Sequence, residues 1–292
     1  MAANQRGGDS LPNLQNVEYH ILSDGVVWVD GGGAFGLVPR TIWAELFPPD
    51  ERNRIPFGLN CVLIRSEGQT ILVDTGYGTK LDEKARQRVG LERPDGGLSE
   101  ALSRLGVTVE EVDIVINTHL HADHCGGNTI YQGGSLVPTF PNAQYLIQRL
   151  EWADAIAPNE RTRATYLPDN YRPLEESGQL KLINGNTQVT GEVRTAIARG
   201  HTRAHQVVIV ESGGETALFV ADMTSLYYHF ERLAWVASYD VEPLESIETK
   251  RYWQQWAVAR DALIIFQHDT QIPFGKLRLD GANFKVKPVS IG

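Results

Sequence analysis

The stretch Thr118-His119-Leu120-His121-Ala122-Asp123-His124-Cys125-Gly126-Gly127-Asn128 places three histidines and one aspartate within six residues, 119–124. The segment before it, 112–117, reads Val-Asp-Ile-Val-Ile-Asn, a β-branched run that is typical of a strand. Gly126 and Gly127 suit a sharp turn. The pattern predicts a loop at the end of a buried strand, where a rigid scaffold can hold polar side chains in place.

The residue types in this loop indicate a metal site. Imidazole and carboxylate are ligands that zinc, iron, manganese and cobalt accept. His119 and His121 can hold one ion from one side, whereas Asp123 and His124 continue around the turn and can reach a second ion. The alternative is a polar surface loop whose histidines occur by chance. We disfavour it because unpaired histidines at this density have no good packing role.

Further candidate ligands occur downstream. His201 follows Arg199-Gly200, Asp222 ends the apolar run 217–221, and His268 ends the run 262–267. Each lies at the end of a strand-like run or on a turn beside one. This repeated placement predicts that the residues meet at one site, and it is a stronger signal than any single histidine.

On these residues the chain resembles the metallo-β-lactamase superfamily. The matching pieces occur in the family's order and span most of the chain: Asp74-Thr75-Gly76 after a strand, His-x-His-x-Asp-His at 119–124, Gly200-His201, Asp222 and His268. The resemblance implies an α/β fold of the αβ/βα sandwich type, in which two mixed β-sheets pack together and helices cover both outer faces. We expect one hydrolase domain over residues 1–292, with 1–15 as a loose N-terminal arm.

The resemblance also implies a dinuclear metal centre. By position, His119, His121 and His201 would hold the first ion, Asp123, His124 and His268 the second, and Asp222 would bridge both. The expected cofactors are two divalent ions, zinc in the first place, with iron, manganese or cobalt as alternatives. Asp74 is expected to orient the metal loop rather than to bind an ion, and His205 to be structural or to lie behind the ligands.

Composition limits the partners and the compartment. The formal charge of −9 disfavours nucleic acid as a partner. No run of 18 apolar residues is present, so no membrane span is expected, and residues 1–32 lack the pattern of a secretory signal. Cys61 and Cys125 do not suggest a disulfide framework, and we favour Cys125 as a small buried residue over a spare ligand. These features favour a cytoplasmic protein, and a homodimer stays open.

The remaining pattern predicts alternating strands and helices. We expect strands at 18–22 and 25–29, a hairpin at 60–66 and 69–74, a loop at 131–141, and helices at 80–89, 98–105 and 245–260. Gly31-Gly32-Gly33-Ala34-Phe35-Gly36 formally matches a dinucleotide-binding fingerprint. We reject that interpretation because Pro39 interrupts the required helix and no βαβ unit surrounds the match. A flexible loop near the pocket is expected instead.

The ligand set predicts hydrolysis by a metal-bridging hydroxide. Two ions about 3.5–4 Å apart can share a water and lower its pKa toward neutrality, and Asp123 could carry a proton to the leaving group. A metal-stabilised binding protein is disfavoured because structural zinc sites are usually closed. We expect a small-molecule lactone or carboxylic ester as substrate. The alternative substrates are a phosphotriester or a thioester. The alternative activity is that of an iron-dependent oxidoreductase with the same ligands.

The substrate contacts are predicted by resemblance to the lactonase and methyl-parathion-hydrolase neighbourhood. In acyl-homoserine lactonases a tyrosine commonly stands three residues after the bridging aspartate, but here that position is Ser225. Tyr227 or Tyr228 could supply the phenol as a catalytic group, or both could pack in the core. Apolar contacts with the substrate are expected from Phe35, Trp43, Tyr227 and Phe230.

Overall fold

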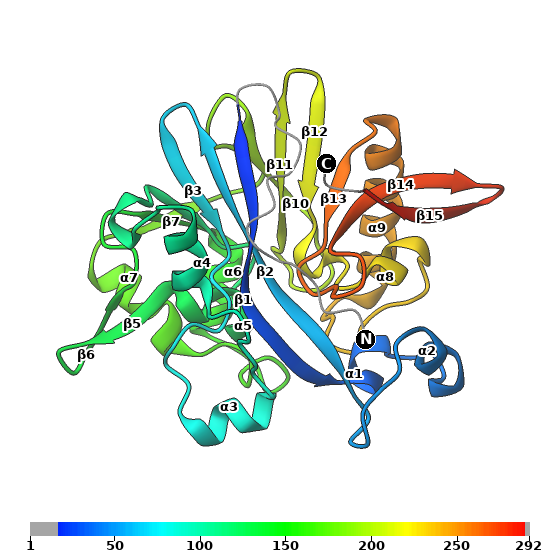
Figure 1. Ribbon diagram of the computed structural model, residues 1–292, viewed down its shortest axis with the longest axis horizontal. Helices are drawn as coiled ribbons and strands as arrows, with labels where there is room; N and C mark the ends of the chain where they lie inside the picture. Colours follow the sequence, from blue (N-terminus) through cyan, green and yellow to red (C-terminus); the bar gives the residue numbers. More distant parts are fainter. Residues whose placement is uncertain (1–16, 290–292) are drawn as a thin grey trace.

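Two β-sheets lie face to face in the computed structural model, which describes residues 17–289 (Figure 1). The first sheet has six strands, in the order β1 (Glu18–Asp30), β2 (Arg54–Ser66), β3 (Gln69–Val73), β4 (Ile114–Ile116), β7 (Gln144–Gln148) and β8 (Leu180–Ile183). The second has seven, in the order β15 (Asn283–Pro288), β14 (Phe274–Asp280), β13 (Leu263–Ile265), β12 (Glu215–Phe219), β11 (Gln206–Ser212), β10 (Val193–Ile197) and β9 (Thr187–Gln188).

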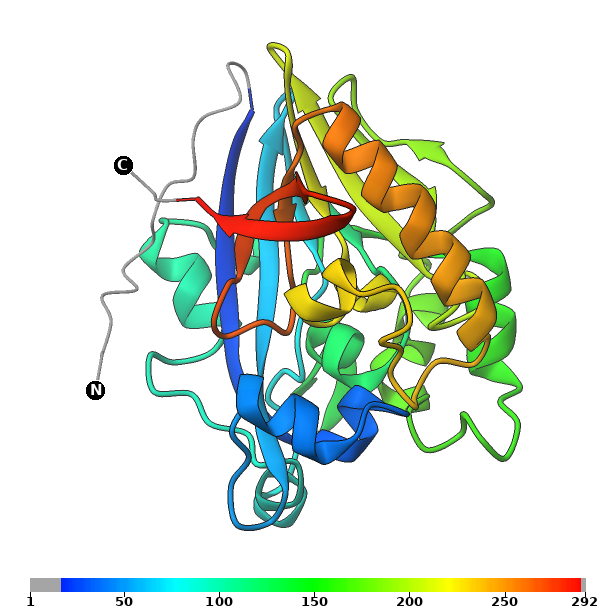
Figure 2. The ribbon, with the colours of Figure 1, turned by 90° about the vertical axis from the view of Figure 1, so that its right-hand side faces the viewer.

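Helices cover both outer faces. The chain contains, in order, α1 (Gly31–Phe35), α2 (Arg40–Leu46), α3 (Glu83–Val89), α4 (Leu98–Arg104), α5 (Ala122–Cys125), α6 (Arg149–Ile156), α7 (Arg172–Glu176), α8 (Tyr227–Glu231) and α9 (Pro243–Ala259). Figure 2 shows α9 running along the outside of the second sheet. None of the helices described by the structure is long and apolar enough to cross a membrane.

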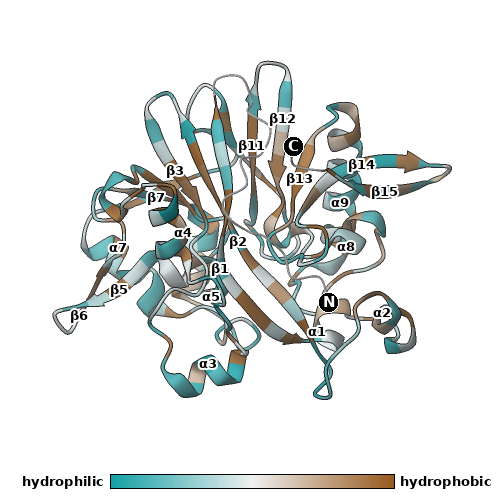
Figure 3. Cartoon of the chain, in the orientation of Figure 1, coloured by the Kyte–Doolittle hydropathy of each residue, from teal (hydrophilic) through white to brown (hydrophobic). Residues whose placement is uncertain are grey.

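Alternating apolar residues explain the layers. On β2, Ile64 belongs to the buried cluster between the two sheets, whereas its neighbour Leu63 belongs to the cluster beneath α4 and α6. Successive side chains of a strand point to opposite faces, so an apolar run of this kind can be buried on both sides. A third cluster packs the outer face of the second sheet against Trp253 and Trp256 of α9. Figure 3 shows the apolar colouring along the strands of both sheets.

The observed layers confirm the expected αβ/βα sandwich. Both sheets are mixed, because β3, β4, β7 and β8 run parallel to one another and β12 runs parallel to β13, while the other pairs are antiparallel. The expected hairpin at 60–74 and the three expected helices form, with shifted ends. The arm expected at residues 1–15 lies outside the described residues.

Several local predictions were wrong. Residues 18–30 form one strand with an irregularity between Ser23 and Val26, because continuous pairing with β2 overrides the turn signal there. Residues 31–35 form α1 rather than a flexible loop, since the carboxylate of Asp30 accepts a hydrogen bond from Gly33 N at 2.7 Å and caps the turn. The segment 131–141 contributes to a two-stranded ribbon of β5 (Thr129–Gln132) and β6 (Ser135–Pro138).

The parallel strands determine where polar residues gather. The carboxyl ends of β3, β4 and β7 meet at one edge of the first sheet. Those of β12 and β13 meet at one edge of the second. Backbone bonds from Gly58 N to His268 O, 2.8 Å, and from Asn60 N to Gln267 O, 3.1 Å, join β2 to the segment after β13. The residues after these strands therefore lie at a common edge.

Candidate metal centre

The histidine-rich loop runs from β4 to α5, and Asp74, at the end of β3, contacts it. Asp74 directly follows β3 and has a positive φ of 56°. Its carboxylate accepts hydrogen bonds from Thr118 N at 2.8 Å and Thr118 Oγ1 at 2.7 Å, and it lies 3.0 Å from Nδ1 of His124. Because these contacts join the ends of two adjacent strands, Asp74 orients the loop, which agrees with the role expected for it.

The seven predicted ligands lie together. Three groups have their ligand atoms within 4.8 Å of one another: His119, His121 and His201; His119, His124 and Asp222; and Asp123, His124 and His268. Asp222 lies between the first and last groups. Its carboxylate oxygens are 3.1 Å from Nε2 of His201 and 2.9 Å from Nε2 of His268. This is where a carboxylate that bridges two ions would have to lie.

The orientation of the imidazoles fits a cation. Nδ1 of His201 contacts a carboxylate oxygen of Asp240 at 2.9 Å, and Nδ1 of His268 contacts the carbonyl oxygen of Gly58 at 2.8 Å. Because both partners accept, each Nδ1 must donate, which leaves the lone pair of each neutral ring on its inner Nε2. Nε2 of His119 is buried and has no hydrogen-bond partner among residues 17–289. Inward lone pairs beside carboxylates form a donor set that suits divalent ions.

The protonation states agree with this reading. Burial lowers the pKa of His119 and His121 well below the ordinary value, and the neighbouring imidazoles lower it further, so both rings are neutral. Burial alone would raise the pKa of Asp222, but the histidines around it, His268 first and His201 next, hold that pKa well below its usual range. Burial lowers the pKa of His124 and His201, but the carboxylates beside them, Asp123 and Asp222 for His124 and Asp222 and Asp240 for His201, raise it above the ordinary value. Neutral His119 and His121 and an ionised Asp222 are the forms that bind metal.

Two supporting residues were not identified from the sequence. Glu151 of α6 is buried, and its carboxylate accepts hydrogen bonds from Leu120 N at 2.9 Å, from the Tyr166 hydroxyl at 2.9 Å and from the Thr202 hydroxyl at 2.6 Å. It therefore ties the 119–121 loop to the turn after His201. Asp240 fixes His201 itself. Neither lies in a motif, and no local pattern distinguishes them from other acidic residues.

The predicted aromatic contacts lie in the core. Phe35 and Trp43 are buried and stacked, with ring centroids 5.2 Å apart, and Phe230 is buried as well. The rings of Tyr227 and Tyr228 lie 4.1 Å apart, and both pack against the buried Phe47. This burial favours the packing alternative for these residues, and their contact with substrate stays a prediction.

Two further polar residues occupy defined places near the ligands. Ser225 donates from Oγ to a carboxylate oxygen of Asp222 at 3.2 Å, so a hydroxyl reaches the candidate bridge from the position where a tyrosine is common in lactonases. His205 is buried beside His119, with ring centroids 5.3 Å apart, and lies outside the three ligand groups. This placement agrees with the role behind the ligands that the sequence suggested.

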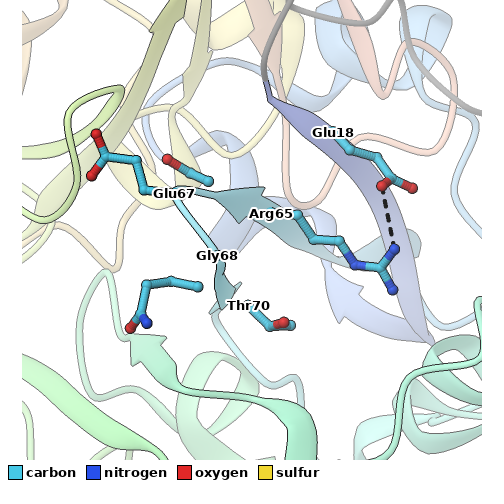
Figure 4. A pocket seen from close by; sticks show the side chains of 7 residues that line it. Glu18, Arg65, Glu67, Gly68 and Thr70 are labelled. Carbon is cyan, nitrogen blue, oxygen red and sulfur yellow. Dashed lines mark hydrogen bonds and ion pairs between the residues drawn. The ribbon is translucent and has the colours of Figure 1, made fainter.

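A separate surface hollow lies away from this centre. Glu18, Arg65 and Thr70 are among its lining residues, and an ion pair of 3.3 Å joins Arg65 to Glu18 (Figure 4). The hollow lies at the turn between β2 and β3, which is the opposite end of β3 from Asp74. It is therefore not part of the metal centre.

Comparison with known proteins agrees with the fold and the centre. The family model of the metallo-β-lactamase superfamily matches residues 54–251. An N-acyl homoserine lactonase of a Bacillus species is 27% identical over 227 residues, which cover 72% of this chain and 81% of the relative. The fold and the site together define a metal-dependent hydrolase. The chain belongs to the metallo-β-lactamase superfamily.

Solved structures of similar proteins show the same architecture. A probable metal-dependent hydrolase from Staphylococcus aureus is 28% identical, with a TM-score of 0.86, and the match covers 94% of this chain and 97% of that one. AidC, described as a dizinc quorum-quenching lactonase in complex with a product, is 22% identical, with a TM-score of 0.80 and coverage of 97% and 98%. At that identity the second match supports the fold alone.

Proposed function

We propose that this protein binds two divalent metal ions, with zinc as the favoured metal, and hydrolyses lactones or carboxylic esters. His119, His121 and His201 would hold one ion, Asp123, His124 and His268 the other, and Asp222 would bridge them. The single observation that carries the proposal is the position of Asp222, whose carboxylate lies 3.1 Å from His201 and 2.9 Å from His268.

The protein's own residues would fix the geometry and move the proton. When bound, two such ions lower the pKa of a water between them and polarise a carbonyl oxygen. Asp240 and Gly58 hold the rings of His201 and His268 in the tautomer that binds metal. The side chain of Asp123 is 25% exposed, whereas that of Asp222 is 8% exposed. The more open carboxylate can therefore pass a proton to the leaving oxygen.

The substrate class rests on the relatives. The Bacillus relatives are named N-acyl homoserine lactonases, and the match covers most of each chain. A lactone and an open ester present the same carbonyl to the centre, so both belong to the proposed class. Because the hydroxyl of Ser225 contacts Asp222 where a tyrosine is common in acyl-homoserine lactonases, the proposal names the class of lactones and esters rather than acyl-homoserine lactones alone.

A substrate panel tests the proposal. Zinc-loaded protein is assayed against a γ-lactone series, p-nitrophenyl esters, a thioester and a phosphotriester, with oxygen consumption recorded in parallel on iron-loaded protein. We expect the highest kcat/KM on lactones or esters and no oxygen uptake. Cleavage of the phosphotriester alone, or oxygen uptake without hydrolysis, would replace the proposed class by one of the alternatives.

A further inference from the structure

The glycine-rich segment 31–36 packs against a part of the chain that is distant in sequence. Residues 236–240, which we call the strap, run across α1. The amide and the hydroxyl of Ser238 both donate to the carbonyl oxygen of Gly33, at 2.9 and 3.0 Å. A Cβ atom added at Gly33 would overlap the phenol oxygen of Tyr239 and lie 2.9 Å from its ring. Only glycine at this position lets the tyrosine lie where it does.

The other side of the strap is fixed next to the metal centre. Asp240 bonds Nδ1 of His201 through one carboxylate oxygen and accepts from the Ser246 hydroxyl at 2.5 Å through the other. Arg161 donates to the carbonyl oxygens of Ser238 at 2.6 Å and Asp240 at 3.0 Å. The strap is therefore held by α1, by α9 and by the segment before α7. Because Asp240 contacts His201, the strap lies beside the predicted ligands.

The hydroxyl of Tyr239 is available to a ligand. The side chain is 40% exposed, and its hydroxyl donates a long hydrogen bond of 3.4 Å to the carbonyl oxygen of Asp30. Burial of the phenol raises its pKa, and the charges of Asp30, Asp123 and Asp222 raise it further. The phenol therefore stays protonated and can donate a hydrogen bond to an acceptor.

We propose that Tyr239 is the tyrosine that contacts the substrate, donating from its hydroxyl to a carbonyl oxygen of the lactone or ester, and that Gly33 sets its position. Tyr227, by contrast, is buried, and the partly buried Tyr228 packs its ring against that of Tyr227. This inference rests on the proposed function. Tyr239 is exposed and would exchange its long hydrogen bond to Asp30 for one to the substrate, so its contribution is to hold the substrate and is expected in KM rather than in kcat.

Four variants separate this role from a structural one. Tyr239→Phe removes only the hydroxyl, and Gly33→Ala displaces the phenol without changing it. The matched controls are Tyr252→Phe, whose side chain is 60% exposed on α9, and Gly32→Ala, whose new Cβ would meet only the side chain of Asp30, at 3.0 Å. Metal content and melting temperature are measured for each variant to show that the centre and the fold are intact.

The readouts are steady-state kinetics on the best lactone or ester and calorimetric binding of the ring-opened product N-hexanoyl-L-homoserine. For the loss of one neutral hydrogen bond we expect KM and the product Kd to rise about 3- to 10-fold in Tyr239→Phe, with kcat changed by less than about twofold. Gly33→Ala should show a rise of the same size or larger. Both controls should match the wild type.

Unchanged KM and Kd in Tyr239→Phe would overturn the inference, and this variant decides alone if Gly33→Ala does not fold. Wild-type protein that neither binds the product nor hydrolyses any lactone or ester would instead overturn the proposed function. The Tyr239→Phe comparison is then made on the thioester or phosphotriester that is cleaved. An unchanged KM on that substrate would overturn the inference independently.

Discussion

Replacing Asp240 by alanine removes the carboxylate that fixes the outer nitrogen of His201. The bond between Nδ1 of His201 and Asp240 is 2.9 Å long and buried, and the Ser246 hydroxyl holds the same carboxylate from the other side. A buried hydrogen bond to a charged group contributes about 1.5–3 kcal/mol. At about 1.4 kcal/mol per factor of ten, Asp240→Ala should weaken binding of the first ion about 10- to 100-fold.

The assay is zinc titration of metal-free protein against a competing chromophoric chelator. Asp240→Asn keeps an acceptor for His201 without the charge, and its zinc affinity should fall between those of wild type and Asp240→Ala. Asp261→Ala is the matched control, because that carboxylate is exposed and pairs with Lys276 away from the centre. A folded Asp240→Ala protein that binds both ions with wild-type affinity would refute the assignment of His201 as a ligand fixed by Asp240.

Three further outcomes follow from the same geometry. Asp222→Ala should lose one ion and most turnover, because the carboxylate between two cations is gone, whereas His205→Ala should keep both ions and its turnover. Equal metal content and activity in the two variants would contradict this division. Glu151→Gln should lower the unfolding free energy by about 1–3 kcal/mol, measured in urea, since an amide cannot accept all three hydrogen bonds of the carboxylate. Chelation should abolish turnover and lower the melting temperature, and added zinc should restore both, because the ions bind only the folded chain; an unchanged melting temperature would argue against a bound cation.

The fold and the ligand set could be predicted because their signals are local. His119, Asp222 and His268 each follow a short apolar run, and the carboxyl ends of parallel strands meet at one edge, so the sequence alone indicates that these residues lie close together. The resemblance to the family then indicates which of these ligands hold each of the two ions. The hairpin at 60–74 and the helix of 245–260 likewise follow from turn chemistry and periodicity.

The supporting residues could not be predicted because their roles depend on tertiary contacts. Asp240 lies 39 positions from His201 along the chain, and the carbonyl of Gly58 lies 210 from His268. The sequence points to Tyr227 and Tyr228 by their spacing from Asp222 and does not single out Tyr239. In the structure the rings of Tyr227 and Tyr228 on α8 pack against Phe47, while the hydroxyl of Tyr239 on the strap reaches the carbonyl oxygen of Asp30.

The glycine run illustrates the same limit. Its glycines suggested flexibility, but in the structure Gly31 lies against Trp43 and Gly33 against Tyr239, so the small residues allow close packing. A pattern of glycines alone does not distinguish a mobile loop from a surface on which another segment rests. The cytoplasmic location and the single domain over residues 1–292 stay predictions.

Anomalous diffraction at the zinc edge, together with elemental analysis of protein purified without chelator, tests the dinuclear centre most directly. We expect close to two equivalents of metal per chain. Two anomalous peaks should lie among the seven ligands, one beside His119, His121 and His201 and one beside Asp123, His124 and His268, with Asp222 contacting both. One equivalent in metal-replete protein, with no peak near His268, would contradict the account.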